Sequence, residues 1–282
     1  MATTVTSRFS MKYLIPIAAA TLLAVSCHRL VFEDRSKCPS FVFFRVEDAN
    51  GVPVNEELRL EIRETSGMEM LASDNVSMDR MEESDYFLQV RKCPEISATG
   101  TAGIKAAVCA GRLCTVAPGT QWDPVYRFAW TSSAMGGETL VPVRMKKEHS
   151  SICVRFRSDE GIFPYTVAAK GNTCGMDLVS GSPLTGPFSC SPAEEEPGVF
   201  RFTVPRQADH GLALELTAKP GVSIEYGPVD EIVLWRALEL IDGFSWELEN
   251  LPDIDIDIDY VRSQMTVVVN DWEMASSVEI TI

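Results

Sequence analysis

The sequence predicts an all-β protein with two β-sandwich domains in tandem. Three observations support this prediction. Short segments of alternating apolar and polar residues recur along the chain, a period-two pattern typical of half-buried strands. Turn residues separate these segments about every eight to twelve positions, which favours sandwiches over alternating strand–helix units. The strand pattern also restarts near residues 147–151, at about the middle of the chain.

The first element is an export signal that ends in a cysteine. Arg8 and Lys12 precede an apolar run that closes with the sequence AVSC at 24–27. A basic segment, a short apolar segment and small residues before a cleavage point make a secretory signal, too short for a comfortable spanning helix. The ending looks like a bacterial lipobox, in which cleavage leaves an acylated cysteine as the first residue. We therefore expect residues 1–26 to be a lipoprotein signal peptide and Cys27 to be acylated; the alternative is an ordinary signal peptide with an incidental cysteine.

The charge of the chain disfavours two classes of partner. The full chain has 25 basic and 40 acidic residues, and removing Arg8 and Lys12 with the signal leaves 23 basic residues and a net charge of −17. Nucleic acids and anionic lipid head groups are bound by Lys/Arg patches, so we expect neither as a partner. Membrane attachment must then come from acyl chains on Cys27, and residues 27–39 are expected to form an acylated tether.

Residues 40–147 are expected to form the N-terminal domain. Glu57–Thr65 alternates strictly, with its aliphatic side chains on one face, as in a half-buried strand. Ser40–Asp48 is aromatic and β-branched, and Asn50-Gly51 closes it with a strong turn signal. The remaining expectations are strands at Tyr86–Val90 and Thr139–Lys147, a loop or short helix over Ser73–Asp85, a strand or helix over Gly100–Ala110, and no central strand around Pro124.

Residues 148–282 are expected to form the C-terminal domain. Val229–Phe244 mixes helix and strand spacing, and we expect a short helix there that ends at Gly243. Glu194–Gly198 is typical of a solvated turn. Strands are expected at Ser151–Arg157, Pro164–Lys170, Val199–Val204, Gly211–Ala218, Ile254–Tyr260, Met265–Asn270 and Val278–Ile282.

The sequence offers little to support catalysis. His28, His149 and His210 are widely spaced, and the sequence contains no zinc-protease, nucleophile-elbow, P-loop or dinucleotide motif. Cys109 and Cys114 lack the spacing of zinc knuckles and thioredoxin-type sites. A catalytic triad assembled from residues far apart in the sequence stays an open alternative. We expect a protein that is not an enzyme, with no catalytic residue, cofactor or metal site.

Four aspartates in the sequence PDIDIDIDY (252–260) suggest a calcium site or a site for a cationic glycan. Period two offers a simpler interpretation, because the isoleucines between them would face the core and the aspartates water. Side chains on one face of a strand stand roughly 7 Å apart, too far to share one ion tightly. We favour the solvated face. The five tryptophans are likewise expected mostly in the core, in preference to a sugar-stacking platform.

The cysteine count predicts at least one unpaired thiol. Of eight cysteines, seven remain once Cys27 is acylated, and an odd number leaves one thiol free or paired between chains. Sequence proximity suggests a disulfide between Cys174 and Cys190 and a pairing among Cys93, Cys109 and Cys114, but spacing alone does not establish the connectivity.

Several segments of the chain resemble one protein family. The sequence FEDRSKCP close behind Cys27, the segments 181–188 and 204–207, and the closing run 243–273 are similar to FimB-type fimbrial anchor lipoproteins of Bacteroidales. The resemblance implies two tandem transthyretin-like β-sandwich domains. It also implies an outer-membrane lipoprotein that anchors a type V fimbria to the cell surface and limits its length. Cys27 is the residue to which the resemblance assigns a role, as the site of acylation.

The resemblance also implies fimbrial subunits as partners. Subunits of such fimbriae exchange strands, and a sheet edge that lacks a strand binds a partner strand through main-chain hydrogen bonds. The candidate strand-exchange segment is the C-terminal strand, Val278, Glu279, Ile280, Thr281 and Ile282. The alternative is a surface glycan-binding lipoprotein of a nutrient-uptake complex. That protein would share the lipobox, the acidity and the sandwiches, but it would need an exposed aromatic pair over a polar cleft.

Overall fold

The computed structural model describes residues 39–66, 69–91, 95–132, 137–157, 163–209, 211–221, 231–259, 264–270 and 275–281. The signal peptide, Cys27 and the tether up to residue 38 lie outside this range. The described elements are strands, apart from the short helices α2 (Met78–Glu83) and α3 (Trp235–Leu238), so the all-β prediction is confirmed. Neither helix is long enough to cross a membrane, and no other candidate span is found in the part of the chain that the structure describes.

The N-terminal sandwich packs a three-stranded sheet against a five-stranded sheet. The first has the order β4-β1-β9, and the second has the order β10-β8-β5-β2-β3. Leu58, Leu60 and Ile62 are fully buried between the sheets, as the alternation of their strand predicts. The strands are β1 (Pro39–Asp48), β2 (Glu57–Glu64), β3 (Met70–Ser77), β4 (Tyr86–Arg91), β5 (Ile96–Ala102), β8 (Tyr126–Ser132), β9 (Glu138–Arg144) and β10 (Lys146–Lys147).

The C-terminal sandwich consists of two larger sheets. One has the order β14-β15-β11-β18-β19-β20, and the other has the order β17-β16-β12-β7-β6 with β13 paired to β12. The strands are β6 (Val108–Ala110), β7 (Leu113–Thr115), β11 (His149–Arg157), β12 (Tyr165–Asp177), β13 (Pro183–Cys190), β14 (Glu194–Glu196), β15 (Val199–Pro205), β16 (Ala213–Ala218), β17 (Glu231–Val233), β18 (Asp253–Asp259), β19 (Gln264–Asn270) and β20 (Ala275–Thr281).

The hairpin β6–β7 belongs to the second sandwich although it precedes residue 148 in sequence. Its strand β7 pairs with the end of β12, where Met176 lies opposite Cys114. Cys114, Trp122 and Val125 are buried in the core of the C-terminal sandwich. The chain therefore leaves the first sandwich after β5, contributes a hairpin to the second, and returns in β8. A single boundary between 40–147 and 148–282 does not describe this exchange.

Most of the strand predictions are confirmed. The short helix expected within Val229–Phe244 is confirmed as α3, but it ends at Leu238 and not at Gly243. Three other expectations differ from the structure. The single strand expected at Thr139–Lys147 is two strands, β9 and β10, which belong to different sheets. The polar stretch Ser73–Asp85 forms the end of β3 as well as α2, because β3 is an end strand whose solvent face is polar. The expected turn Glu194–Gly198 begins with the short exposed strand β14.

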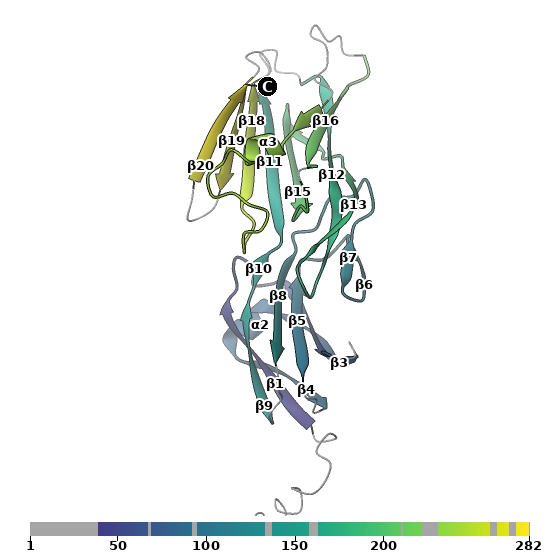
Figure 1. Cartoon of the computed structure of the whole chain (residues 1–282), viewed down its shortest axis with the longest axis vertical. Helices are drawn as coiled ribbons and strands as arrows, with labels where there is room; N and C mark the ends of the chain where they lie inside the picture. The colour runs from purple at the N-terminus through teal and green to yellow at the C-terminus, as the bar shows by residue number, and fades with distance from the viewer. Residues whose placement is uncertain are drawn as a thin grey trace, which may run out of the picture.

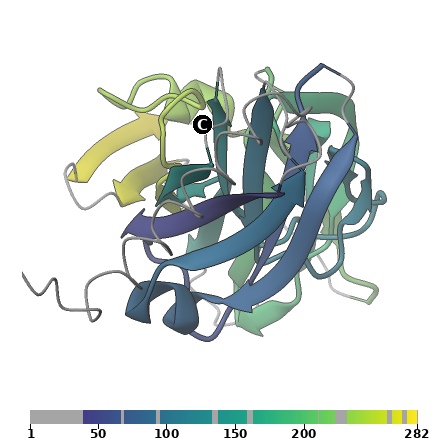
Figure 2. The same cartoon turned by 90° about the horizontal axis from the view of Figure 1, so that it is seen from below.

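The two sandwiches are stacked along the long axis of the molecule (Figure 1). Strand β1 begins at the lower end of this view, and β20 ends at the upper end. Viewed from below, the strands of the N-terminal sandwich lie in front, and β18–β20 lie behind them to one side (Figure 2). The residue that follows the tether and the C-terminal strand are thus at opposite ends.

Candidate assembly edge and the junction between the sandwiches

The candidate strand-exchange segment lies in the end strand of a sheet. Strand β20 pairs antiparallel with β19, from Asn270↔Ala275 to Gln264↔Thr281. In the strand order of the described sheet, β20 has a neighbour on one side only. An end strand presents a row of backbone N–H and C=O groups to which another chain can add. Residues 278–281 thus lie at an edge that suits strand addition, and Ile282 lies outside the described residues.

The opposite end of the same sheet is built differently. Strand β14 is short, and its three glutamates are all exposed. A register shift interrupts its pairing with β15 between Glu194 and Glu196. Short, charged and irregular end strands discourage addition of a further strand. Of the two ends of this sheet, β20 is therefore the more suitable for strand addition.

The aspartates of β18 form a ladder of ion pairs on the outer face of the sheet. Isoleucines 254, 256 and 258 are buried in the core, and the alternating aspartates are half-buried on the other face, which confirms the period-two interpretation. Asp255 lies 2.7 Å from Arg155, and Asp253 lies 2.7 Å from Lys147. No cluster of three or more acidic, cysteine or histidine side chains that would suit a metal ion occurs within the described ranges.

A buried ion network joins the two sandwiches. Glu148, at the junction, is 2% exposed. One of its carboxylate oxygens lies 2.9 Å from Arg127 of β8, and the other lies 2.9 Å from Arg206. Arg127 also donates to the carbonyl of Val179 at 3.2 Å, and Arg206 donates to the carbonyls of residues 246 and 248. One carboxylate therefore holds a cation from each sandwich, a role that the sequence analysis missed.

Asparagine side chains make a second connection across the junction. Asn50, in the turn after β1, donates to the carbonyl of Met145 at 2.9 Å and to the side chain of Asn250. The same Asn250 oxygen accepts the backbone N–H of Lys147 at 2.9 Å. The turn predicted at Asn50-Gly51 is confirmed, with positive φ angles at both residues. It therefore brings the N-terminal sandwich into contact with the loop before β18.

His149 is buried at the same junction and should make stability depend on pH. Its Nδ1 lies 3.0 Å from the carbonyl of Val125, and its ring packs edge-on against Tyr126. Burial lowers the pKa of His149 to about 4. Between pH 7 and that value the unfolded chain binds a proton that the folded chain does not bind, so stability falls as the pH falls.

We expect the protonation of His149 in the unfolded chain to lower the free energy of unfolding by about 2 kcal/mol when the pH falls from 7 to 5. Carboxylates also titrate in acid, so the measurement compares the parent protein with His149→Gln in denaturant unfolding at both pH values. The variant should lose about 2 kcal/mol less than the parent over this interval. Identical losses in the two proteins would show that His149 is not kept neutral by burial.

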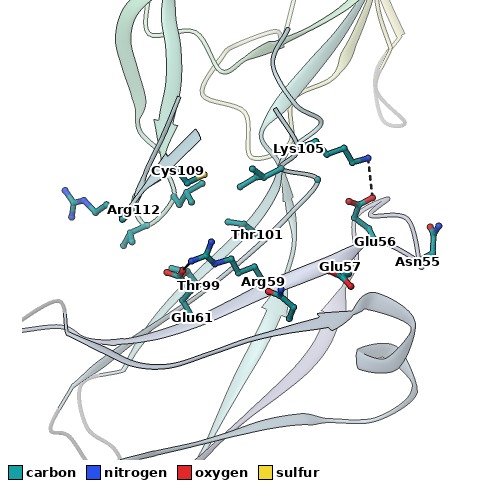
Figure 3. Close-up of a pocket in the computed structure, with 16 residues that line it drawn as sticks. Asn55, Glu56, Glu57, Arg59, Glu61, Thr99, Thr101, Lys105, Cys109 and Arg112 are labelled. Carbon is teal, nitrogen blue, oxygen red and sulfur yellow. Dashed lines mark ion pairs between the residues drawn. The ribbon is translucent and has the colours of Figure 1, made fainter. Parts of the chain in front are cut away.

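A cavity of about 410 Å³ with a mixed polar and apolar lining lies between the sandwiches. Its lower wall is the outer face of β2 and β5, and its upper wall includes the hairpin β6–β7 (Figure 3). Arg59 and Arg112 line it from opposite sides, and Lys105 lies 4.0 Å from Glu56 across one end. The lining includes basic, acidic, amide and hydroxyl side chains but no aromatic side chain.

The structure confirms one of the two expected cysteine pairings and contradicts the other. Cys109 and Cys114 form a disulfide that closes the hairpin β6–β7, which confirms a pairing within that group. Cys174 and Cys190 are free thiols, so the suggested bond between them is not formed. Although β12 and β13 are paired, Cys190 lies opposite Ala169, five residues along β12 from Cys174. That offset corresponds to roughly 16 Å of strand, beyond the reach of a disulfide. Cys93 lies outside the described residues.

The tryptophans do not form an exposed platform in the described part of the chain. Trp122 is buried in the C-terminal core, and Trp130 and Trp246 are half-buried against the two cores. Trp235 is half-buried, and Trp272 lies outside the described residues, as do His28 and His210. The exposed aromatic side chain among the described residues is Phe87 of β4, which packs against Phe41 and Phe43 on the outer face of a sheet.

Solved structures share this two-sandwich architecture. The fimbrial anchor protein Mfa2 from Porphyromonas gingivalis aligns with a TM-score of 0.57 and 10% identity, over 83% of this chain and 98% of that protein. A candidate adhesin from Bacteroides thetaiotaomicron aligns with a TM-score of 0.58 and 12% identity, over 88% of this chain and 100% of the adhesin.

A candidate polysaccharide-binding protein from the same organism aligns with a TM-score of 0.59 and 12% identity, over 86% of this chain and 98% of that protein. The sequence matches no protein-family model, and comparison with curated proteins finds no match. At such low identities, a structural likeness establishes the fold and not the activity. The chain therefore has the fold of Bacteroidales surface proteins that include a fimbrial anchor.

Proposed function

We propose that this protein is an outer-membrane lipoprotein that anchors a type V fimbria to the cell surface and limits its length. Acyl chains on Cys27 hold the chain in the membrane, and β20 pairs with a strand of the adjacent fimbrial subunit. The likeness in fold to the fimbrial anchor protein of P. gingivalis, over 83% of this chain and 98% of that protein, is the main support. The lipobox that ends at Cys27 supports the same proposal from the sequence.

The arrangement of the molecule suits an anchor. Strand β1, which follows the tether, begins at one end, and β20 ends at the other (Figure 1). A protein attached to the membrane near Pro39 therefore presents its candidate assembly edge away from the attachment point. A polymer that meets such a fixed terminal subunit cannot grow past it, which gives the polymer a defined end on the cell.

One observation favours the glycan-binding alternative: the likeness in fold to a candidate polysaccharide-binding protein is as strong as the likeness to the fimbrial anchor. The described surface, however, lacks the site that this alternative needs. That function requires an exposed aromatic pair over a polar cleft. The cavity between the sandwiches has a mixed polar and apolar lining, and no aromatic side chain lines it. Phe43 and Phe87 lie on the outer face of the sheet β4-β1-β9, whereas the cavity lies against the other sheet of that sandwich. We also keep the expectation that the protein is not an enzyme and needs no cofactor.

Removing residues 279–282 should release fimbriae from the cell. The deletion takes away most of the second half of β20, so fewer backbone groups remain to bind a partner strand. We expect the fimbrial subunit to move from the cell-bound fraction to the medium, measured by immunoblotting both fractions. Circular dichroism and thermal unfolding of the truncated chain check that it still folds.

A matched control addresses the other end strand of the same sheet. Glu195→Pro changes β14, which is short, exposed and irregularly paired, and it should leave fimbrial retention unchanged. If the folded truncated chain retains fimbriae as well as the parent and Glu195→Pro proteins do, assembly through β20 is wrong.

A further inference from the structure

The outer face of the sheet β4-β1-β9 carries an apolar cluster between polar side chains, since Phe41 lies opposite the exposed Gln89 of β4 and the exposed Glu138 of β9. Phe41 and Phe43 of β1 and Phe87 of β4 form a cluster with ring centroids 5.8–6.5 Å apart. Phe43 lies between Phe87 on one neighbouring strand and Leu140 of β9 on the other. We call the surface formed by Phe41, Phe43, Phe87 and Leu140 the aromatic face.

The core of the N-terminal sandwich does not need these side chains. Val42 and Phe44, which alternate with them along β1, are the residues that are fully buried in the core. Phe87 is 53% exposed and Leu140 is 47% exposed on the opposite side. Because a contiguous exposed apolar patch is costly in water, such patches mark contact surfaces.

Ion pairs lie along the border of the aromatic face. Arg45 lies 2.6 Å from Asp85 at one side, and Arg144 lies 2.8 Å from Glu47 at another. These two acids are therefore offset by basic partners, although the mature body has a large negative charge. The pairing reduces the repulsion that an acidic protein would otherwise meet at a lipid surface.

The aromatic face lies at the start of the folded chain. Eleven residues, 28–38, separate the expected acylated Cys27 from Pro39, the first residue of β1. Fully extended, this segment reaches at most about 40 Å. An acylated Cys27 therefore limits the distance between the start of β1 and the bilayer to about 40 Å. The bilayer is the partner that the tether brings within reach, and apolar rings beside short aliphatic side chains suit its interface.

We propose that the aromatic face rests on the lipid bilayer, with Phe43 and Phe87 inserted at the boundary between head groups and acyl chains. This proposal rests on the acylation of Cys27 in the proposed function. The contact makes the attachment a two-point one, because the acyl chains and the sheet are held by the same bilayer. It would fix the direction in which the C-terminal sandwich and β20 point.

Fluorescence quenching by brominated lipid tests this contact. The acylated full-length chain is purified in detergent and reconstituted in phosphatidylcholine vesicles, with or without bromine on the acyl chains. Phe87→Trp places a reporter on the aromatic face. Leu240→Trp is the matched control, since Leu240 is 59% exposed and lies just after α3 in the other sandwich. We expect brominated lipid to quench the added fluorescence of Phe87→Trp by about half and that of Leu240→Trp very little.

Vesicle flotation separates the two proposals. A chain that does not float with the vesicles and lacks acyl mass on Cys27 overturns the lipid anchor and the docking together. A chain that floats, but in which the Phe87→Trp reporter is quenched no more than the Leu240→Trp reporter, overturns the docking alone. The latter result would mean that water or another protein covers the aromatic face.

Discussion

Glu148→Gln should lower the free energy of unfolding by about 3–5 kcal/mol, the usual cost of breaking a buried ion pair from one side. The substitution keeps the size of the side chain but removes the one charge that faces both Arg127 and Arg206. Their side chains are only 8% and 12% exposed, so water cannot replace the lost carboxylate. Two guanidinium groups would then remain buried near each other without a counter-charge.

Denaturant unfolding followed by circular dichroism measures this loss, and an exposed ion pair provides the control. Glu47 pairs with Arg144 where the side chains are 39% and 73% exposed. Glu47→Gln should cost no more than about 1 kcal/mol. Because Glu148 links the two sandwiches, its variant should also be cut faster by protease at the junction. Equal stabilities of the two variants would contradict the role given to Glu148.

The sequence predicted the strands whose faces differ most in polarity. In β18, and in β2 from Leu58 to Ile62, every second residue is aliphatic and buried, so the period alone identified both the strand and its core face. The turn at Asn50-Gly51 was equally clear because those residues tolerate positive φ. These predictions succeed because they depend on neighbours in sequence.

Strand β3 was missed because its environment gives it no such pattern. It is an end strand with largely exposed residues, and in its sequence MLASDNVS only Val76 is buried.

The aromatic face was missed for the opposite reason. The run FVFF at 41–44 places apolar residues on both faces of β1, and the out-of-phase phenylalanines were a usable signal of a second apolar surface.

The contacts at the junction could not be predicted without knowledge of the fold. Glu148 is 21 residues from Arg127 and 58 residues from Arg206, and nothing local to any of them indicates that they meet. The same holds for the hairpin β6–β7, which joins the second sandwich through pairing with residues of β12 about sixty positions later. Sequence proximity predicted that Cys109 and Cys114 belong to a group that forms a disulfide. That Cys174 does not meet Cys190 depends on the register of β12 and β13, which sequence proximity does not give.

Cys27→Ser should abolish membrane attachment and release fimbriae into the medium. Each buried methylene of an acyl chain contributes about 0.8 kcal/mol of membrane affinity, and serine accepts none of these chains. The acidic body offers no electrostatic substitute, and the aromatic face is too small to hold the protein by itself. Folding should be unaffected, because residue 27 precedes the first strand by eleven intervening residues.

The direct measurement is the amount of fimbrial subunit in the medium and on washed cells that express the parent chain, Cys27→Ser or Cys38→Ser. Cys38 is the next cysteine along the chain and lies outside the lipobox, so its variant controls for the loss of a thiol. We predict that fimbriae move to the medium with Cys27→Ser and stay on the cells with Cys38→Ser. Fimbriae that remain cell-bound with Cys27→Ser would contradict the proposal that this protein is their lipid-held anchor.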